Sequence, residues 1–311
     1  MPIATYRHAF VIYNRSARGL DRLGTEQIDI AIGALREDGH DVTYVATRGP
    51  GSAIDIAREC VRQGADLILI AGGDGTVNEA ANGAIHAAVP LGVLPAGTAN
   101  ILANELGITG PIEAVARQVK DWVPRRISVG RLTADGGASR RYFLMVAGVG
   151  LDAHILVQVD PEVKRAQGKV AFWLAGLAQL SQELEEFDVC LGEEKRLATF
   201  ALASRVRNYG GSFTITREAG LLRDDFAFAL FEGRSPFRYL GYLGGVLANT
   251  LDRTEGVTLL HGTAAEFHPR DSAPVYVEVD GELAGALPAT VEIVPDALTL
   301  LVPPAFLSWT T

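Results

Sequence analysis

The sequence predicts two domains: an N-terminal α/β domain with a mostly parallel sheet, followed by a mainly antiparallel β domain. In the first third of the chain, short apolar segments alternate with amphipathic helical segments, which is the pattern of βαβ units. From about Arg126 onward, short strands with alternating polarity follow one another, separated by glycine and charged turns. A length of 311 residues also fits two modest domains better than one.

Four strands of the parallel sheet are expected in the N-terminal domain. They are the apolar runs Ala9 to Tyr13, Val42 to Ala46, Leu67 to Ala71 and Leu91 to Leu94. Between them, apolar residues recur at helical spacing. The inner faces of three helices are given by Ile28, Ala31, Ile32 and Leu35, by Ala53, Ala57 and Cys60, and by Ala80, Ala81, Ala84 and Ile85. Helices are therefore expected to cover the sheet.

The second domain is expected to contain short strands interrupted by helices. The clearest strands are Tyr142 to Val146, Ala198 to Ala203, Phe226 to Phe231 and Val275 to Val279. A long helix is predicted by the apolar stripe Trp173, Leu177, Leu180, Leu184 and Phe187, and a shorter helix by the segment Phe237 to Leu247. The break between the domains is placed near Pro124, which gives domains of residues 1–127 and 128–302.

Composition excludes several classes of partner and site. A net charge of -9 argues against a nucleic-acid partner, which requires clustered Lys and Arg along the phosphates. The two cysteines, Cys60 and Cys190, are far apart and have no nearby Cys or His at metal-ligand spacing, so neither a disulfide framework nor a zinc site is expected. The apolar stretches end well before the roughly 18 residues of a spanning helix, and the N-terminus lacks a signal pattern. The protein is therefore expected to be cytoplasmic.

A glycine-rich turn follows the strand that ends at Ala71 and opens a helix. Its residues are Gly72, Gly73, Asp74, Gly75 and Thr76. Glycines allow a ligand to approach the backbone closely, and the N–H groups at a helix start favour an anion such as a phosphate chain. A carboxylate beside phosphate is repelled by several kcal/mol at about 4 Å unless a magnesium ion lies between them. Asp74 therefore indicates a Mg-nucleotide, while the alternative is a tight turn in which Asp74 caps the helix.

A second turn of the same design contains Gly97, Thr98 and Asn100, again after a strand and before a helix. In a parallel sheet, both turns and the loop that begins at Asn14 leave the strands at the same edge. We therefore expect Asn14, Arg15, Thr47 and Thr98 to contact nucleotide phosphates or ribose. For Arg15 and Arg18, the alternative is that they are solvated surface charges.

Five segments together resemble the diacylglycerol kinase catalytic family, which includes soluble bacterial diacylglycerol kinases and sphingosine kinases. They are GGDGTVNE (Gly72 to Glu79), LPAGTAN (Leu94 to Asn100), AGVGLDA (Ala147 to Ala153), NYGG (Asn208 to Gly211) and VDGE (Val279 to Glu282). The resemblance spans nearly the whole chain. It implies a nucleotide domain similar to those of NAD kinases and phosphofructokinases, a β-sandwich that shapes the lipid site, and a C-terminal return of residues 303–311 to the first domain.

The resemblance implies ATP as phosphoryl donor, Mg²⁺ as cofactor, and Glu282 as the residue that accepts a proton from the lipid hydroxyl. A carboxylate suits this task, because a hydroxyl is a poor nucleophile until a base takes its proton. Asp280 is a second candidate for the same task, whereas the alternative is that this Asp-Gly-Glu segment only turns one strand into the next. The sheet-edge argument and the resemblance together give the expected nucleotide site as Asn14, Arg15, Arg18, Thr47, Gly72, Gly73, Asp74, Gly75, Thr76, Asn78, Glu79, Gly97, Thr98 and Asn100.

Bacterial members of this family also carry a second, structural magnesium. By resemblance, its ligands here are the Asp224 side chain and the backbone carbonyls of Leu221 and Phe226. Asp225 stands where the family usually has glycine, and glycine accepts a positive φ more readily than aspartate does. Three further departures are Arg15 in place of a frequent proline, and Arg217 and Glu218 in place of a common Ala-Pro pair.

The function expected from these observations is an ATP-dependent lipid kinase that phosphorylates the hydroxyl of a diacylglycerol-like or sphingoid lipid. Two alternatives are an NAD kinase-like enzyme that phosphorylates a ribose hydroxyl and a non-catalytic nucleotide or lipid sensor. The late VDGE segment and the AGVGLDA and NYGG pair favour the lipid. A lipid substrate further implies transient peripheral contact with a membrane, and a homodimer is left open. The identity of the lipid depends on apolar shape spread over many side chains.

Overall fold

The computed structural model describes residues 6–17, 20, 26–151, 153, 184–209 and 213–309. The chain forms two compact units, Met1–Val129 with Pro295–Thr311, and Gly130–Val294. It passes from one unit to the other within two long strands, β5 (Val123–Ala134) and β18 (Ala289–Val302). None of the helices in the described ranges has the length and apolar character needed to cross a bilayer.

The first unit is built on a parallel sheet with the order β2-β1-β3-β4, continued by the C-terminal end of β18. The strands are β1 (His8–Tyr13), β2 (Asp41–Ala46), β3 (Leu67–Gly72) and β4 (Pro90–Pro95). Every residue of β3 is buried, as expected for a central strand covered on both faces. The predicted parallel sheet is confirmed, and each predicted strand end lies within one residue of the observed end.

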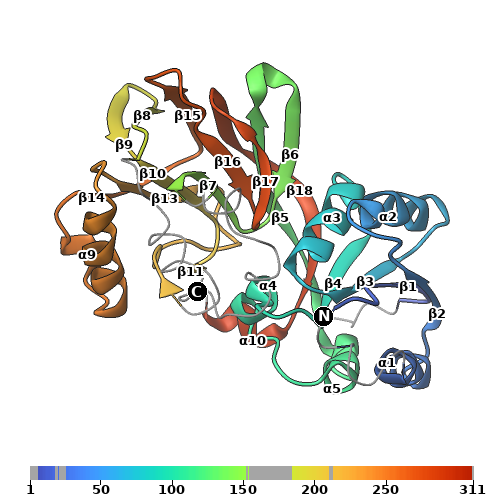
Figure 1. The fold of residues 1–311 in the computed structure, drawn as a ribbon. Helices are drawn as coiled ribbons and strands as arrows, with labels where there is room; N and C mark the ends of the chain where they lie inside the picture. The colour runs from blue at the N-terminus through green and yellow to red at the C-terminus, as the bar shows by residue number, and fades with distance from the viewer. Residues whose placement is uncertain are drawn as a thin grey trace. The chain divides into compact units, whose positions relative to one another are not determined.

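Helices cover both faces of this sheet (Figure 1). They are α1 (Glu26–Glu37), α2 (Ser52–Arg62), α3 (Asp74–Ala84), α4 (Ile101–Glu105), α5 (Ile112–Ala116), the 3₁₀ turn Val119–Asp121 and α10 (Pro304–Trp309). Figure 1 shows α2 and α3 together on one face, with α1 and α5 on the other. The predicted inner faces of α1 and α2 are buried. Ile85 lies just after α3, because the helix ends at Ala84.

The second unit contains antiparallel strands in two main sheets (Figure 1). One sheet joins the first part of β18 to β15, β8 and β9, with β5 and β6 beside it, and the other has the order β14-β13-β10-β7-β16-β17. The strands are β6 (Ser139–Phe143), β7 (Val146–Gly150), β8 (Phe187–Leu191), β9 (Glu194–Ala198), β10 (Phe200–Ser204), β11 (Asn208–Tyr209), β12 (Phe213–Thr214), β13 (Phe226–Phe231), β14 (Val257–Gly262), β15 (Ala264–Pro269), β16 (Tyr276–Val279) and β17 (Glu282–Ala286). Short helical segments are α9 (Pro236–Leu247) and the 3₁₀ turns Asp135–Gly137 and Leu251–Arg253.

The two sheets of the second unit pack on one apolar core. Phe187 and Phe267 enter it from the first sheet, and Phe228 enters it from the second. Phe143 of β6 and Phe226 of β13 stack across the core with ring centroids 5.6 Å apart. This is the face-to-face arrangement of a β-sandwich, as the resemblance implied.

The predicted strand Tyr142 to Val146 is wrong as a single strand. β6 ends at Phe143 and β7 begins at Val146. Between them, the N–H groups of Leu144 and Met145 donate hydrogen bonds to the Asp280 carboxylate instead of to a neighbouring strand. The chain therefore passes from one sheet to the other at this point: β6 pairs with β5 in the first sheet, and β7 belongs to the second.

Two other elements differ from the predictions. The expected strand Ala198 to Ala203 is divided at Thr199, whose hydroxyl bonds the Tyr239 hydroxyl at 2.6 Å and the Gly233 carbonyl at 3.1 Å. Phe187 was expected on a helix but begins β8, where it is fully buried. Leu184 of the same stripe is buried but also lies outside any helix, whereas Trp173, Leu177 and Leu180 are not among the described residues.

Candidate functional site

Loops from three neighbouring strands meet at the carboxyl edge of the sheet in the first unit. Asn14 follows β1 directly, and its side-chain amide donates to the Thr76 hydroxyl at 3.3 Å. The Asn14 N–H donates to the carbonyl of Ala71, the residue before the first glycine turn, at 3.0 Å. The Ala96 N–H, after β4, donates to the Gly72 carbonyl at 3.1 Å. These bonds hold the Asn14 loop and the two glycine turns together.

The glycines of the two turns allow their backbones to touch. A Cβ placed on Gly97 would lie 2.4 Å from the Gly73 Cα, and one placed on Gly72 would lie 2.8 Å from the Thr76 Cβ. A side chain at Gly97 would therefore push the two turns apart, and one at Gly72 would collide with Thr76 inside the first turn. Without them, the loops present backbone groups where the sheet ends, as a phosphate site requires.

Asp74 is the first residue of α3, which follows the N-cap residue Gly73. Its Oδ1 accepts a hydrogen bond from the Leu102 N–H in α4 at 3.3 Å, so the carboxylate joins the starts of two helices. Gly73 makes no side-chain cap, and Asp74 does not serve as the N-cap of its own helix. The capping alternative raised for Asp74 therefore does not describe its position.

Asn100 shapes the second turn. Its backbone has a φ of 47°, in the left-handed region that asparagine tolerates better than most residues. Its side-chain oxygen accepts from the Gly97 N–H at 2.8 Å, and its amide donates to the Gly97 carbonyl at 3.0 Å. Thr98, between them, is exposed. The turn is thus closed by one side chain and leaves Thr98 accessible to solvent.

Two residues expected at the nucleotide site make contacts within the protein. Glu79 of α3 accepts hydrogen bonds from the N–H groups of Gly51 at 2.7 Å and Ala53 at 3.1 Å, at the start of α2. This gives Glu79 the role of a cap supplied from another helix. The side-chain oxygen of Asn78 accepts from the Asn82 amide at 2.9 Å, one turn further along α3.

The remaining expected nucleotide residues lie around the same edge. The exposed Arg15 guanidinium lies 5.9 Å from the centre of the Tyr13 ring, a cation–π arrangement. The Thr47 N–H, just after β2, donates to the Tyr13 carbonyl at 2.8 Å. Gly75 is half-buried in the first turn of α3. Arg18 lies outside the described residues, as do Asp152 of AGVGLDA and the glycines of NYGG.

In the second unit, the VDGE segment forms a tight hairpin between β16 and β17. Asp280 and Gly281 have φ values of 50° and 88°, as in a type I′ turn, and Val279 pairs with Glu282. The segment therefore does turn one strand into the next. Glu282 begins β17 with its side chain 49% exposed, and its Oε2 lies 3.5 Å from Nη1 of Arg141. The Glu282 carboxylate is thus half exposed at the start of β17, beside the Arg141 guanidinium.

The Asp280 carboxylate is held by three backbone donors. It accepts hydrogen bonds from the N–H groups of Leu144 at 2.9 Å, Met145 at 3.0 Å and Val146 at 2.9 Å. Because both oxygens are engaged in the junction of β6 and β7, Asp280 is better placed to fix the hairpin than to accept a proton.

The turn implied as a structural magnesium site contains a guanidinium. Arg205 is fully buried, and its Nη2 donates to the Leu221 carbonyl at 2.8 Å. Its Nη1 donates to the carbonyls of Arg223 at 3.1 Å and Asp225 at 3.5 Å. A carbonyl implied as a metal ligand thus already accepts from a fixed cation, so these residues do not fit a magnesium ion. Phe226, the other implied carbonyl ligand, begins β13.

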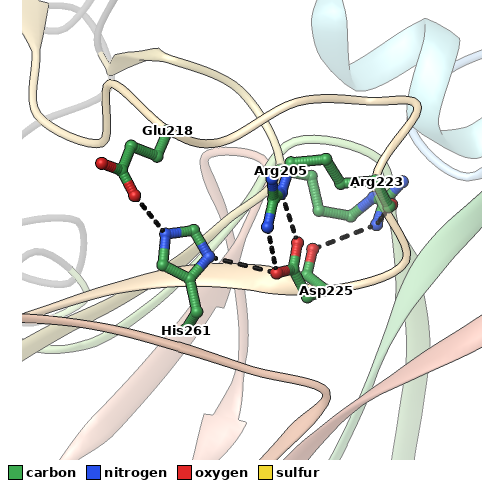
Figure 2. Close-up of polar contacts among 5 residues, drawn as sticks. All are labelled: Arg205, Glu218, Arg223, Asp225 and His261. Atoms are coloured by element: carbon green, nitrogen blue, oxygen red, sulfur yellow. Dashed lines mark hydrogen bonds and ion pairs between the residues drawn. The ribbon is translucent and has the colours of Figure 1, made fainter.

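Side chains around this turn form an ion-pair network, shown in Figure 2. The Asp225 carboxylate accepts from Nε and Nη2 of Arg223 at 2.8 and 2.7 Å, and lies 3.1 Å from Nδ1 of His261. The other ring nitrogen of His261 lies 3.1 Å from Glu218. Hydrogen bonding to Arg223 lowers the pKa of Asp225 from its ordinary value, against an opposing effect of partial burial.

Arg205 and His261 were not among the residues predicted from the sequence. Arg205 directly follows the apolar run of β10, and a charged residue at the end of a buried strand is a signal that it must be paired. His261 has no comparable local signal, because its partners lie 36 and 43 residues away in the sequence.

Comparisons with known proteins agree with this architecture. The family model of the diacylglycerol kinase catalytic domain matches residues 8–132. A diacylglycerol kinase of Mycobacterium tuberculosis is 30% identical over 282 residues, covering 88% of this chain and 88% of that protein. A diacylglycerol kinase of Bacillus subtilis is 32% identical over 178 residues, covering 56% of each chain.

A crystal structure of a diacylglycerol kinase from Bacillus anthracis str. Sterne has the same fold. It superposes with a TM-score of 0.78 at 19% identity, covering 97% of this chain and 99% of that one. The 30% identity to the mycobacterial protein over most of both chains establishes the family. The chain belongs to the diacylglycerol kinase catalytic family and is a lipid kinase, a transferase that acts on an alcohol group.

Proposed function

We propose that this lipid kinase transfers the γ-phosphoryl group of ATP to the hydroxyl of a diacylglycerol-like or sphingoid lipid. The observation that carries the proposal is the backbone contact of two glycine turns, at Gly73 and Gly97, beside the Asp74 carboxylate. The mycobacterial and Bacillus subtilis relatives are diacylglycerol kinases, which favours diacylglycerol among these alcohols.

The glycine turns and the start of α3 suit the phosphates of ATP. Backbone N–H groups in the first turn of a helix lack intrahelical acceptors and favour negative charge. The contact of Gly73 with Gly97 fixes the two turns, so little entropy is lost when they bind the phosphates. Thr98 and Asn14 would then contact phosphate or ribose from either side of these turns.

Asp74 would hold the magnesium ion that accompanies ATP. Its carboxylate is half-buried at the start of α3, and carboxylate oxygen is a ligand that Mg²⁺ accepts. When bound, the ion neutralises charge on the phosphates during transfer. Without it, Asp74 would repel the nucleotide. We therefore expect Asp74 to make nucleotide binding depend on magnesium.

Glu282 would accept the proton of the lipid hydroxyl. As the hydroxyl oxygen bonds to the γ-phosphorus, the bond from that phosphorus to the β,γ-bridging oxygen breaks, ADP leaves, and the proton passes to the Glu282 carboxylate. The exposed side chain on the hairpin is accessible for this step, and Asp280 holds the hairpin in place. The products are a lipid phosphate monoester and ADP.

A lipid substrate must be reached at a membrane, and α9 offers a surface for this contact. Phe237, Leu240 and Leu247 are 82%, 50% and 65% exposed, whereas Tyr239 and Tyr242 on the opposite side of the helix are buried. Three large apolar side chains on one outward stripe suit transient insertion among lipid headgroups. We propose that α9 makes peripheral contact with the inner face of the membrane, where ATP is available.

The function is tested by incubating the purified full chain with γ-labelled ATP and magnesium. Parallel samples contain dispersed diacylglycerol, sphingosine, a membrane lipid extract or NAD. We expect labelled product in the lipid-extractable phase of at least one lipid sample, identified by mass spectrometry, and none from NAD. Label on NAD alone, or nucleotide binding without a phosphorylated lipid in any sample, would refute the proposal.

A further inference from the structure

A buried positive charge lies in the turn that the resemblance assigned to a metal. Arg205 follows β10, is 0% exposed, and directs its guanidinium at the carbonyls of Leu221, Arg223 and Asp225. These three carbonyls belong to the segment just before β13. A single cation therefore organises the whole segment from inside the protein.

The guanidinium is charged despite its burial. A guanidinium keeps its proton in proteins, and the carboxylates of Asp224 and Asp225 lie near this one. A buried charge is tolerated only when dipoles and opposite charges compensate it, and here carbonyl oxygens and two carboxylates do so. These are the same ligand types, oxygen dipoles and a carboxylate, that would hold a magnesium ion.

We propose that the Arg205 guanidinium is the built-in cation of this turn, and that the protein takes no structural magnesium there. The Leu221 carbonyl, implied as a metal ligand, lies 2.8 Å from Nη2 of Arg205. A divalent ion on the same oxygen would lie close to the guanidinium, and the two positive charges would repel each other. The site that needs magnesium is then the nucleotide site alone.

Asp225, next to the expected ligand Asp224, supports a guanidinium in place of a magnesium ion. Asp225, in place of the usual glycine, does not have a positive φ, so the turn does not use the conformation that glycine would provide. Instead, its carboxylate pairs with Arg223 and lies 3.1 Å from His261, with Glu218 on the other side of the ring (Figure 2). Two departures from the family pattern, Glu218 and Asp225, thus meet on one histidine.

The network and the buried guanidinium act on the same segment. Arg223 and Asp225 each give a carbonyl to Arg205, and their side chains pair with each other on the more exposed side of the turn. The turn is therefore held on its buried side by the Arg205 guanidinium and on its exposed side by the Arg223–Asp225 pair, without a bound ion. The inference concerns metal binding and stability, so it does not depend on which alcohol is phosphorylated.

The test measures thermal unfolding of the nucleotide-free full chain in EDTA and in millimolar Mg²⁺, for the wild type and for Asp224→Asn. We expect magnesium to change the wild-type Tm by no more than about 1 °C, because an ion that does not bind the native state cannot stabilise it. Titration calorimetry with Mg²⁺ should likewise give the same heat for both proteins. A magnesium-dependent rise in the wild-type Tm that Asp224→Asn removes would overturn the inference.

A second variant removes the guanidinium. Arg205→Ala is expected to lower Tm by about 10 °C, because carbonyls and carboxylates lose their buried counter-charge. It should also create a response to Mg²⁺ that the wild type lacks, since the Leu221 carbonyl and Asp224 are then accessible to an ion. If this variant does not fold, the comparison of wild type with Asp224→Asn still decides the question.

Discussion

Gly97 faces Gly73 so closely that a Cβ on Gly97 would lie 2.4 Å from the Gly73 Cα and 2.8 Å from Oδ1 of Asn100. The two glycines belong to consecutive turns, one after β3 and one after β4. Their contact fixes the spacing of the loops proposed to bind the phosphates. The glycine at position 97 is therefore needed for the space it leaves, since its backbone does not have a positive φ.

Gly97→Ala is expected to lower the free energy of unfolding by about 1–3 kcal/mol, because backbone atoms must move to admit the methyl group. ATP affinity should fall as well, since the turns separate. Urea unfolding and nucleotide binding by calorimetry measure the two effects. Gly33→Ala in α1 is the control, because the added Cβ would meet no atom within 4 Å. This substitution should raise the free energy of unfolding by about 0.5–1 kcal/mol, since alanine favours a helix more than glycine does. Unchanged ATP affinity in Gly97→Ala would contradict the role of this contact.

Glu282→Gln is expected to reduce lipid phosphorylation at least about 100-fold while ATP binding stays close to that of the wild type, because the amide cannot accept the proton. Radiolabel transfer and ATP calorimetry measure these quantities on the same protein samples. Glu266→Gln changes another exposed strand carboxylate of the same unit and should leave turnover unchanged. Turnover retained in Glu282→Gln would remove this residue from the proton-accepting role.

Asp280→Ala is expected to destabilise the protein by about 2–4 kcal/mol, since three backbone N–H groups lose a charged acceptor. Asp280→Asn keeps one oxygen and tolerates a φ of 50°, so its loss of stability should be smaller. Urea unfolding of both variants gives the comparison. If Asp280 only positions Glu282, Asp280→Asn should retain measurable turnover with a pH profile like that of the wild type. A shifted pH profile would instead indicate that Asp280 exchanges protons.

The parallel sheet of the first unit could be predicted because its signals are local. Each strand is an apolar run followed by a turn or helix, and βαβ order fixes the parallel direction. The same locality located the two glycine turns, because each lies between a strand and a helix. Their convergence with Asn14 followed from the rule that parallel strands end at one edge.

The errors concern residues whose partners are distant in sequence. The break after Phe143 depends on Asp280, which is 136 residues from Leu144. Two further contacts that local patterns do not reveal are also distant: Glu79 caps α2 from 28 residues away, and Arg205 bonds the Leu221 carbonyl from 16 residues away. Local patterns predict strands and turns. The partners of a buried charge cannot be predicted in this way, because tertiary packing decides which polar groups lie next to it.

Leu240→Ser in α9 is expected to weaken binding to phospholipid vesicles by about 5- to 30-fold, since about 1–2 kcal/mol of apolar transfer is lost. Sedimentation with vesicles measures the bound fraction. Leu259→Ser is a matched control, because Leu259 is 41% exposed on β14 compared with 50% for Leu240 on α9. Equal loss of binding in both variants would show that α9 has no special part in membrane contact.

The stability that Asp225 contributes is expected to disappear in acid. Its carboxylate faces Arg223, His261 and the buried Arg205, and hydrogen bonding to Arg223 holds its pKa below the ordinary value of 3.8. A group whose pKa is lower in the folded state stabilises the protein above its unfolded pKa and loses this effect as pH falls through the folded value. Asp225→Asn should therefore lower the free energy of unfolding by about 1 kcal/mol from pH 7 down to about pH 5, and by progressively less below about pH 4.

Urea unfolding of both proteins across this range tests the prediction, with Asp271→Asn as an exposed control. A difference between wild type and Asp225→Asn that persists unchanged at pH values near 3 would show that the charge of Asp225 is not what stabilises the turn.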